Sequence, residues 1–227
     1  HVSGRGVERL RAAGIDVVVG VRADEVERQL APYLHHRRTG RPRVTLKLAA
    51  TLDGRTAAPD HSSRWITGPE ARADAHRQRA EHDAVLVGAG TVRADDPALT
   101  VREVEGADPL RVVLGAAPPG SRVHPCLEVA GELTEVLDQL GGKGILSLLV
   151  EGGATVAQAF HAAGLVDRYL VYLAPALLGG DDGHPLLAGP GAPTMAGIGR
   201  GRFTGIERVG DDLRIEMTPD RPPGSGA

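Results

Sequence analysis

The sequence predicts an α/β fold built on a mostly parallel sheet, and three observations point to it. From residue 44 onward, short apolar runs typical of buried strands alternate with stretches of helical periodicity. Two of the predicted helices stop at glycines, Gly141 and Gly164, as helices commonly do. The last two apolar runs flank Gly210–Asp211, which is typical of an antiparallel hairpin. We therefore expect helices flanking a mixed sheet that is parallel except at its C-terminal end.

The first 40 residues are expected to form a small βα piece. Residues 4–13 are predicted as a helix, residues 15–21 as a buried strand, and Asp24 as the cap of a second helix. Residues 35–43 are basic and contain glycine and proline, which predicts a linker or a surface crossing. This break in the pattern places a boundary near Arg41, and the piece before it is too small to hold a core alone.

After this boundary, strands and helices alternate along the chain. Pro69 and Glu70 suit the first turn of the first helix, because proline needs no donor there and a carboxylate favours the positive end of the helix dipole. The Pro/Gly-rich tail 219–227 is predicted to be disordered. Strands are expected at 44–50, 83–90, 109–115, 145–153 and 167–175, helices at 68–82, 131–142 and 154–164, and the hairpin at 203–217.

Composition and charge exclude several classes of function. The chain has 227 residues, a formal net charge of −3 and 3% aromatic residues, so nothing suggests a nucleic-acid partner. Cys126 is the only cysteine, which excludes an internal disulfide and a multi-thiolate zinc site. The histidines lack metal-ligand spacing and residues 124–126 (HPC) are interpreted as coincidence, so no metal is expected. No apolar run approaches the ~20 residues of a membrane span, and we expect a cytoplasmic protein.

Three of the predicted strands end in unusual loops, 51–68, 88–102 and 151–158. Ligands of open α/β sheets bind beyond the carboxyl ends of the strands. Gly152 and Gly153 lead into a helix whose free N–H groups and dipole would attract a phosphate. The loops therefore indicate a dinucleotide or phosphorylated ligand. Neither glycine turn matches G-x-G-x-x-G, so simple tight turns stay an equal alternative.

Several charged residues near these loops are candidates for chemistry. Lys47 lies inside a strand and Glu151 ends one, so they either form a structural ion pair or contact substrate. Asp53 is either a turn former or a catalytic carboxylate. Arg79 and Arg102 suit bidentate phosphate binding, with a solvated surface position as the alternative.

Trp65 is the only tryptophan and stands in a polar run just before a predicted helix. It is either a core anchor or the lip of a binding site. Its neighbours in the loop favour the binding site.

Long segments at 44–57, 62–102 and 148–180 together closely resemble one family. They are similar to the reductase domain of the bifunctional riboflavin-biosynthesis deaminase/reductase, over roughly residues 41–218. The resemblance implies a dihydrofolate-reductase-like fold, a homodimer, and residues 1–40 as the C-terminal remnant of a deaminase-like domain with its linker. It also implies NADPH-dependent reduction of the ribose of 5-amino-6-(5-phosphoribosylamino)uracil to the ribitylamino compound.

The resemblance also implies roles for individual residues. Lys47, Asp53 and Glu151 are the expected catalytic residues. The expected substrate contacts are Ser63, Arg79, Leu99, Arg102 and Glu151. The expected cofactor contacts are Ala49, Trp65, Thr91, Asp95, Gly153, Ala154, Thr155, Val156, Ala157, Gln158 and Ala159.

Two departures from the family leave alternatives open. Gly115 and Ala116 stand where the family usually has Asp-Ser, and the segment 123–131 is short by a strand and a helix. One alternative is therefore a reductase-like module that binds nucleotide or dimerises without catalysis. Another is a reductase of dihydrofolate or of the diamino-pyrimidinone. The deaminase-like first 40 residues favour the uracil, because they imply that deamination comes first.

Overall fold

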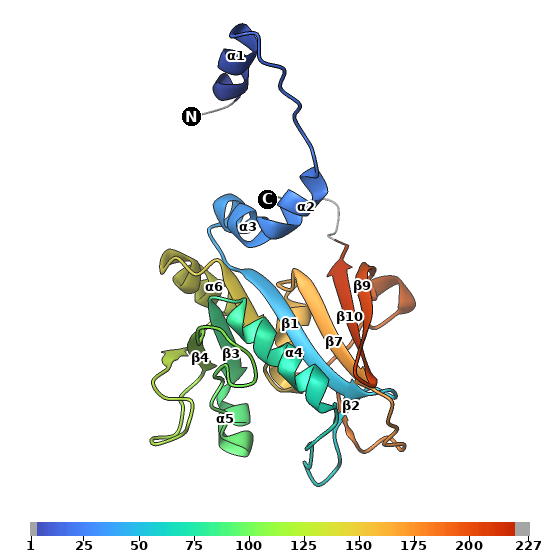
Figure 1. The fold of residues 1–227 in the computed structure, drawn as a ribbon. Helices are drawn as coiled ribbons and strands as arrows, with labels where there is room; N and C mark the ends of the chain where they lie inside the picture. Colours follow the sequence, from blue (N-terminus) through green and yellow to red (C-terminus); the bar gives the residue numbers. More distant parts are fainter. Residues whose placement is uncertain (1–3, 221–227) are drawn as a thin grey trace.

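An eight-stranded mixed sheet forms the centre of the computed structural model, which describes residues 4–220 (Figure 1). The strand order is β5-β4-β3-β6-β1-β7-β10-β9. The strands from β5 to β7 are parallel, whereas β10 pairs antiparallel with β7 and β9 pairs antiparallel with β10. The predicted fold class is confirmed. The strands of the sheet are β1 Arg43–Thr51, β3 Ala84–Gly88, β4 Leu110–Leu114, β5 Leu127–Val129, β6 Ser147–Val150, β7 Arg168–Ala174, β9 Gly201–Val209 and β10 Asp212–Pro219.

Seven α-helices and a small second sheet accompany the central sheet in the described residues. Strand β2 pairs with β8 on the rim of the main sheet. The helices are α1 Arg5–Ala12, α2 Ala23–Gln29, α3 Ala31–Thr39, α4 Pro69–Ala80, α5 Ala89–Asp95, α6 Leu133–Gly142 and α7 Ala154–Ala162. The remaining elements are β2 Arg55–Ala57, β8 His184–Pro185 and the 3₁₀ turn Met195–Gly197.

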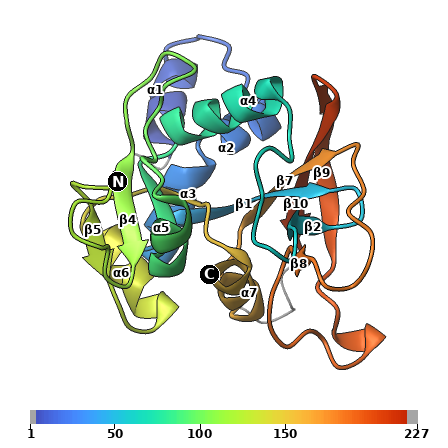
Figure 2. The ribbon, with the colours of Figure 1, turned by 90° about the horizontal axis from the view of Figure 1, so that it is seen from below.

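Apolar side chains cover both faces of the sheet, as a parallel sheet requires. The larger cluster joins alternate residues of the central strands to the inner sides of α6 and α7, with Leu140 and Phe160 fully buried. The second cluster lies on the opposite face and includes Val92 of α5. Figure 2 shows α4 on one side of the sheet and α7 on the other. The sheet thus separates two helical layers, and its strand ends stay accessible between them.

The N-terminal piece differs from the sequence prediction. Residues 15–21 form no strand, and Val18 and Val19 are 80% and 68% exposed. No neighbouring strand in the described residues pairs with this segment. Its valines and isoleucine therefore gain no packing or backbone pairing from an extended conformation, although they favour strands. It runs as an extended link between α1 and α2, with α1 standing apart from the sheet (Figure 1).

The second predicted helix is divided in two, and the predicted linker 35–43 is mostly helical. Helix α2 is capped at Arg22 rather than Asp24, which lies in its first turn. Helix α3 continues to Thr39 because it packs on the sheet domain, where Arg41 forms a 2.6 Å ion pair with Asp138 of α6. The boundary near Arg41 falls between α3 and β1, and the division into domains stays a prediction.

The short segment after β4 holds a strand that the sequence did not predict. Strand β5 pairs directly with β4, and the described stretch 115–126 between them contains no helix. Gly115 adopts a φ of +102°, a conformation that favours glycine, so the residue at this departure from the family suits its backbone. Strand β10 extends into the predicted tail as far as Pro219, and residues 221–227 lie outside the described part.

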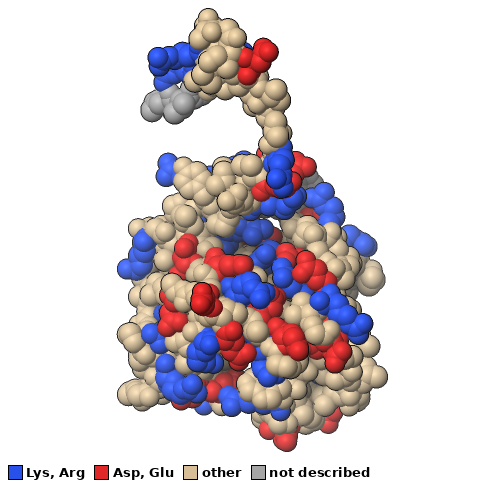
Figure 3. Space-filling view, in the orientation of Figure 1, with Lys and Arg blue, Asp and Glu red and all other residues tan. Residues whose placement is uncertain are grey.

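Charges of both signs are interspersed on the face seen in Figure 3. This distribution agrees with the small formal net charge of −3. Among the described residues, no helix has the length and apolar character needed to cross a bilayer.

Candidate active site

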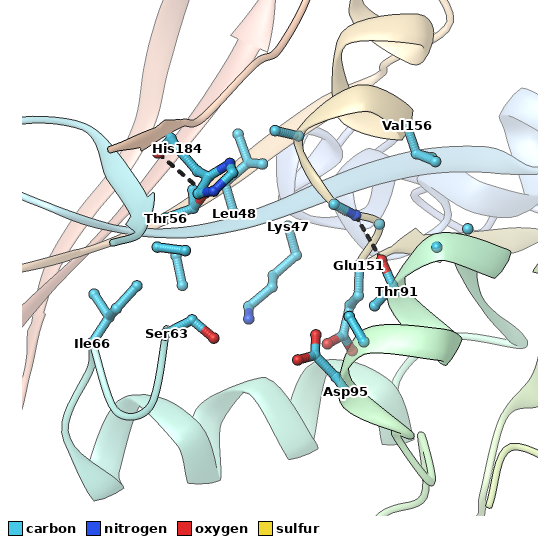
Figure 4. A pocket seen from close by; sticks show the side chains of 18 of the residues that line it. Lys47, Leu48, Thr56, Ser63, Ile66, Thr91, Asp95, Glu151, Val156 and His184 are labelled. Carbon is cyan, nitrogen blue, oxygen red and sulfur yellow. Dashed lines mark hydrogen bonds between the residues drawn. The ribbon is translucent and has the colours of Figure 1, made fainter. Parts of the chain in front are cut away.

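A cleft of about 1030 Å³ opens at the carboxyl ends of β1, β3 and β6. Helix α4 forms one wall, α5 and the start of α7 form the opposite wall, and the β2–α4 loop closes one end. The three unusual loops therefore meet at one place, because parallel strands present their carboxyl ends at the same edge of a sheet. Lys47, Ser63, Asp95 and Glu151 point into the same space from different elements (Figure 4).

Most of the residues predicted for the site line this cleft. They are Lys47, Ala49, Ser63, Trp65, Arg79, Thr91, Asp95, Arg102, Glu151, Gly153, Ala154, Thr155 and Val156.

The other five predicted residues lie outside the lining. Asp53 accepts hydrogen bonds from the Thr51 hydroxyl and the Gly179 N–H, which lower its pKa to about 2 and hold the strand-end turn to a later loop. This arrangement favours the turn interpretation of Asp53. Leu99 is 2% exposed within the second apolar cluster. On α7, Gln158 donates to the carbonyl of Pro190, and Ala157 and Ala159 also lie beyond the lining.

A buried ion pair between Arg79 and Glu151 crosses the floor of the cleft. Arg79 Nε and Nη2 lie 2.6 and 2.8 Å from the two Glu151 oxygens, and Arg79 Nη1 donates to the Thr100 carbonyl at 3.2 Å. Burial by itself would raise the pKa of Glu151, but the charge and hydrogen bonds of Arg79 outweigh it and hold that pKa at about 2. Glu151 is therefore ionised and paired with Arg79, not with Lys47 as the sequence allowed.

Lys47 lines the cleft beside this ion pair. Burial lowers the pKa of its ammonium group; Glu151 opposes that shift and Arg79 adds to it. Its Nζ lies 5.7 Å from the centre of the Tyr172 ring. A half-buried lysine with a lowered pKa is able to exchange a proton with a bound ligand.

Helix α4 contributes residues that the sequence analysis missed. Arg72, His76 and Arg79 line the cleft and are spaced four and three apart, so they share one face of the helix. His76 Nδ1 accepts a 3.1 Å hydrogen bond from the backbone N–H of Arg102. Burial lowers the pKa of His76, and the guanidinium groups of Arg79 and Arg102 lower it further. The helical spacing around Arg79 was the signal that could have revealed Arg72 and His76.

His61 and His184 were also missed, for a different reason. Their rings stack at 4.5 Å between centroids on the rim of the cleft. His61 lies in the β2–α4 loop and His184 in β8, more than a hundred residues apart in the chain, so no local pattern links them.

Trp65 is not a core anchor. Its side chain is 70% exposed on the rim of the cleft. The Arg72 guanidinium lies 4.5 Å from the ring centroid and covers one face by a cation–π contact. The exposed aromatic surface supports the interpretation of Trp65 as the lip of a binding site.

The start of α7 opens into the cleft and has the features that suit an anion. Ala154, Thr155 and Val156 are its first residues, and their N–H groups have no intrahelical partner. Gly152 permits the close approach of this turn, because a Cβ there would meet Val156 at 2.7 Å. The Gly153 N–H donates to Thr91 Oγ1 at 3.2 Å and ties α7 to α5. The wall thus combines a positive dipole end with small residues that leave room for a ligand.

Comparison with known proteins relates this chain to one family. A family model described as the RibD C-terminal domain matches residues 42–215. The "Riboflavin biosynthesis protein RibD" of Mycobacterium tuberculosis (strain CDC 1551 / Oshkosh) is 44% identical over 230 residues, which cover 95% of this chain and 66% of the relative. The chain thus spans slightly less than two thirds of the length of that relative.

Solved structures give the same result. Acinetobacter baumannii RibD, form 1, aligns with a TM-score of 0.85 and 32% identity, over 96% of this chain and 69% of that one. A Thermotoga maritima diaminohydroxyphosphoribosylaminopyrimidine deaminase/5-amino-6-(5-phosphoribosylamino)uracil reductase aligns with a TM-score of 0.83 and 29% identity, over 96% and 68% of the two chains. Dihydrofolate reductase from Enterococcus faecalis, at 13% identity and a TM-score of 0.54 over 81% of this chain and 99% of its own, shares the fold alone. The expected dihydrofolate-reductase-like fold is confirmed.

Proposed function

Because this chain belongs to the family of the RibD C-terminal domain, we propose that it is an NADPH-dependent reductase of 5-amino-6-(5-phosphoribosylamino)uracil. The product is the compound in which the ribose has become a ribityl chain. One observation carries the proposal: a single cleft joins an open helix N-terminus to a half-buried lysine and two arginines. That combination suits two phosphorylated ligands held side by side, as hydride transfer between them requires.

The α7 side of the cleft fits a dinucleotide. The free N–H groups of Ala154 to Val156 would hold its phosphates, and Thr91, Asp95 and Trp65 border the same space. Reductases of this kind generally use a nicotinamide cofactor, and we propose NADPH as the one used here. Bound there, NADPH would supply the hydride for reduction of C1′ of the ribose in its ring-opened form.

The α4 side of the cleft fits the substrate. Arg102 donates from its guanidinium to Thr100 Oγ1 at 2.7 Å and is otherwise exposed, so it has donors left for the 5′-phosphate. Arg79 is already held by Glu151 and would meet the substrate in that fixed geometry. His76 positions Arg102 by accepting its backbone N–H.

Lys47 is our candidate for the proton transfer. Its ammonium lies in the same space as Ser63 and Glu151 (Figure 4). It would polarise C1′ and give a proton to the oxygen or nitrogen that gains charge as the hydride arrives. Glu151 fixes the field around Lys47 and keeps Arg79 in place, which makes it a positioning residue in this scheme.

An assay of NADPH oxidation with the phosphoribosylamino-uracil tests the proposal. Turnover that depends on both compounds is the expected result. Tight NADPH binding without turnover would support the alternative of a module that binds nucleotide without catalysis. Faster turnover with dihydrofolate or with the diamino-pyrimidinone would support a reductase of that compound instead. NADPH at ~100 times its Kd should add about 2.7 kcal/mol to the free energy of unfolding, so the absence of any thermal shift would contradict every nucleotide-binding version.

We also propose a cytoplasmic homodimer. Strand β9 is last in the sheet order and pairs only with β10 among the described residues. It exposes Phe203 and Ile206 at 67% and 59%, and Leu177 after β7 is 72% exposed. An exposed edge strand with large apolar side chains is a typical surface for self-association. Light scattering should give a dimer mass that falls to the monomer for Phe203→Asp; a monomeric wild-type chain would overturn the proposal.

A further inference from the structure

Three potential metal ligands lie close together on the β4–β5 connection, away from the cleft. His124, Cys126 and Glu128 each place a ligand atom within 4.8 Å of those of the other two. Within residues 4–220 no other group of three histidine, cysteine or acidic side chains meets this spacing. The chain bends at Pro125, and Cys126 and Glu128 follow on either side of Leu127, the first residue of β5. Strands β4 and β5 form the edge of the sheet opposite β9 (Figure 2).

The hydrogen bonds of His124 prepare one ring nitrogen for a metal. Its Nε2 lies 3.2 Å from the Pro118 carbonyl, an acceptor, so the proton belongs on Nε2. The lone pair is then on Nδ1, which faces Cys126 Sγ at 3.6 Å. Metal-binding histidines typically donate their other N–H to a carbonyl or carboxylate in this way.

Glu128 is oriented by the same turn. The Ala117 N–H donates to Glu128 Oε1 at 3.0 Å. The second carboxylate oxygen is left for another partner, and the side chain is exposed enough to receive one from solvent. Two of the three groups are therefore fixed by the backbone of residues 117 and 118, outside the ligand set itself.

The distances agree with a tetrahedral ion. Bonds of about 2.1 Å to nitrogen and 2.3 Å to sulfur at a tetrahedral angle separate these two atoms by about 3.6 Å. The separation between His124 Nδ1 and Cys126 Sγ is also 3.6 Å. A set of one thiolate, one imidazole and one carboxylate suits Zn²⁺, and it does not suit Mg²⁺ or Ca²⁺, which prefer oxygen ligands.

We propose that His124 Nδ1, Cys126 Sγ and a Glu128 carboxylate oxygen form a Zn²⁺ site, with water as the fourth ligand. The sequence pattern H-P-C predicts no metal site because it lacks a second cysteine, but in the structure Glu128 lies beside His124 and Cys126 and supplies the third ligand. The ion would clamp the turn at residues 117 and 118 to β5. That turn directly follows Gly115 and Ala116, so the metal would stabilise the loop at the end of β4, independently of the proposed reduction.

Cobalt(II) binding to the full chain tests the site. Cys126 is the only cysteine, so a thiolate-to-cobalt charge-transfer band can come from no other residue. We expect one Co²⁺ per chain with this band and a tetrahedral d–d spectrum, both displaced by Zn²⁺. Absence of the band at saturating Co²⁺, or one metal shared by two chains, would overturn the proposal.

Three variants and one control make the test specific. Cys126→Ser should abolish the charge-transfer band. His124→Ala and Glu128→Gln should each weaken Zn²⁺ binding, measured by competition with a chromogenic chelator. Loss of a residue that only orients a metal ligand typically lowers metal affinity about 10–100-fold. Loss of a ligand itself should lower it by at least as much. Glu132→Gln, an exposed carboxylate four residues away, is the matched control and should bind Zn²⁺ like the wild type. Equal affinity for Zn²⁺ in Glu128→Gln and Glu132→Gln would remove Glu128 from the site and reject the three-ligand proposal.

Discussion

Trp65 shows how one side chain can report on the proposed cofactor site. It is the only tryptophan, it is 70% exposed, and it lines the cleft from the β2–α4 loop that closes one end. A nicotinamide ring stacking near it would quench its fluorescence. Titration with NADPH should therefore give a saturable loss of tryptophan emission. If emission does not change at NADPH concentrations that raise the Tm, the cofactor binds away from Trp65.

Arg102 has hydrogen-bonding capacity left for a phosphate, because its guanidinium donates to Thr100 Oγ1 and the side chain is exposed. A charge-assisted hydrogen bond contributes about 1.5–3 kcal/mol, so Arg102→Ala should raise the KM for substrate about 10–100-fold and leave the KM for NADPH nearly unchanged. Steady-state kinetics with each compound varied in turn measures this split. Arg37→Ala, an exposed arginine on α3 that does not line the cleft, is the matched control and should alter neither constant. Equal rises in both KM values would contradict a phosphate contact.

Glu151 links the site to stability. Its side chain is 8% exposed and that of Arg79 is 14% exposed, so Glu151→Gln leaves a buried guanidinium without its counter-ion. Removing one partner of a buried pair typically costs about 3–5 kcal/mol. We expect a loss of that order in urea unfolding at neutral pH, together with lower kcat/KM. The folded pKa of about 2 lies below the ordinary 4.5, so the wild-type pair stabilises the protein above pH 4.5 and is lost as pH falls towards 2.

At the scale of elements, the turn before α7 depends on the absence of a side chain. A Cβ on Gly152 would meet the Cβ and Cγ1 of Val156 at 2.7 Å, so Gly152→Ala must displace the first turn of α7. We expect the Kd for NADPH to rise about tenfold or more, since each 1.4 kcal/mol is a factor of ten, as measured by calorimetry. Gly142→Ala is the matched control, because a Cβ there meets nothing within 4 Å. Unchanged NADPH affinity in Gly152→Ala would exclude this turn from the cofactor site.

The sequence was sufficient for elements whose partners are local or strongly patterned. Helix α4 begins at Pro69 as predicted, and the hairpin turns at Gly210, because capping and turn chemistry act within a few residues. The strand predicted at residues 15–21 was wrong, because a strand needs a neighbouring strand and the sequence pattern does not reveal whether one is present. Helix α5 was missed because its Ala-Gly-Thr start resembles a loop, and packing of Val92 on the sheet overrides that signal.

The site residues could be predicted from the sequence only in part. Most of the expected residues line the cleft because they follow the ends of parallel strands, which must converge. The pairing of Arg79 with Glu151, and the place of Asp53 outside the cleft, depend on side-chain directions across elements. Such directions are set by tertiary packing, which no local pattern contains.

At the scale of the whole molecule, the parallel sheet explains why one cleft serves both proposed ligands. Strands β1, β3 and β6 are adjacent in the sheet although β1 and β6 lie about a hundred residues apart in the chain. Helix α4 lies on one face, whereas α7 starts at the other. Substrate contacts from α4 and phosphate contacts from α7 therefore approach the same strand ends from opposite sides.

His82 should make the stability of the whole fold depend on pH. Its ring lies between α4 and β1, with Nδ1 at 2.6 Å from the Gln78 carbonyl and Nε2 at 3.1 Å from Thr45 Oγ1. Burial lowers its pKa from 6.5 to about 4, and the nearby Arg168 and Arg43 act in the same direction. Unfolding therefore takes up a proton between these values, so stability is full above pH 6.5 and declines as pH falls towards 4.

At about 1.4 kcal/mol per pKa unit, His82 should account for a loss of about 3 kcal/mol across this window. Urea unfolding at a series of pH values measures it. His76, whose pKa is also lowered by burial, contributes a decline in the same direction, so the wild-type curve contains both. The variant His82→Gln should be less stable than the wild type at neutral pH, because the replacement disturbs the buried contacts with Gln78 and Thr45. Its stability should also change less with pH, by about the 3 kcal/mol assigned to His82. A variant with the wild-type slope would show that another group controls the acid response.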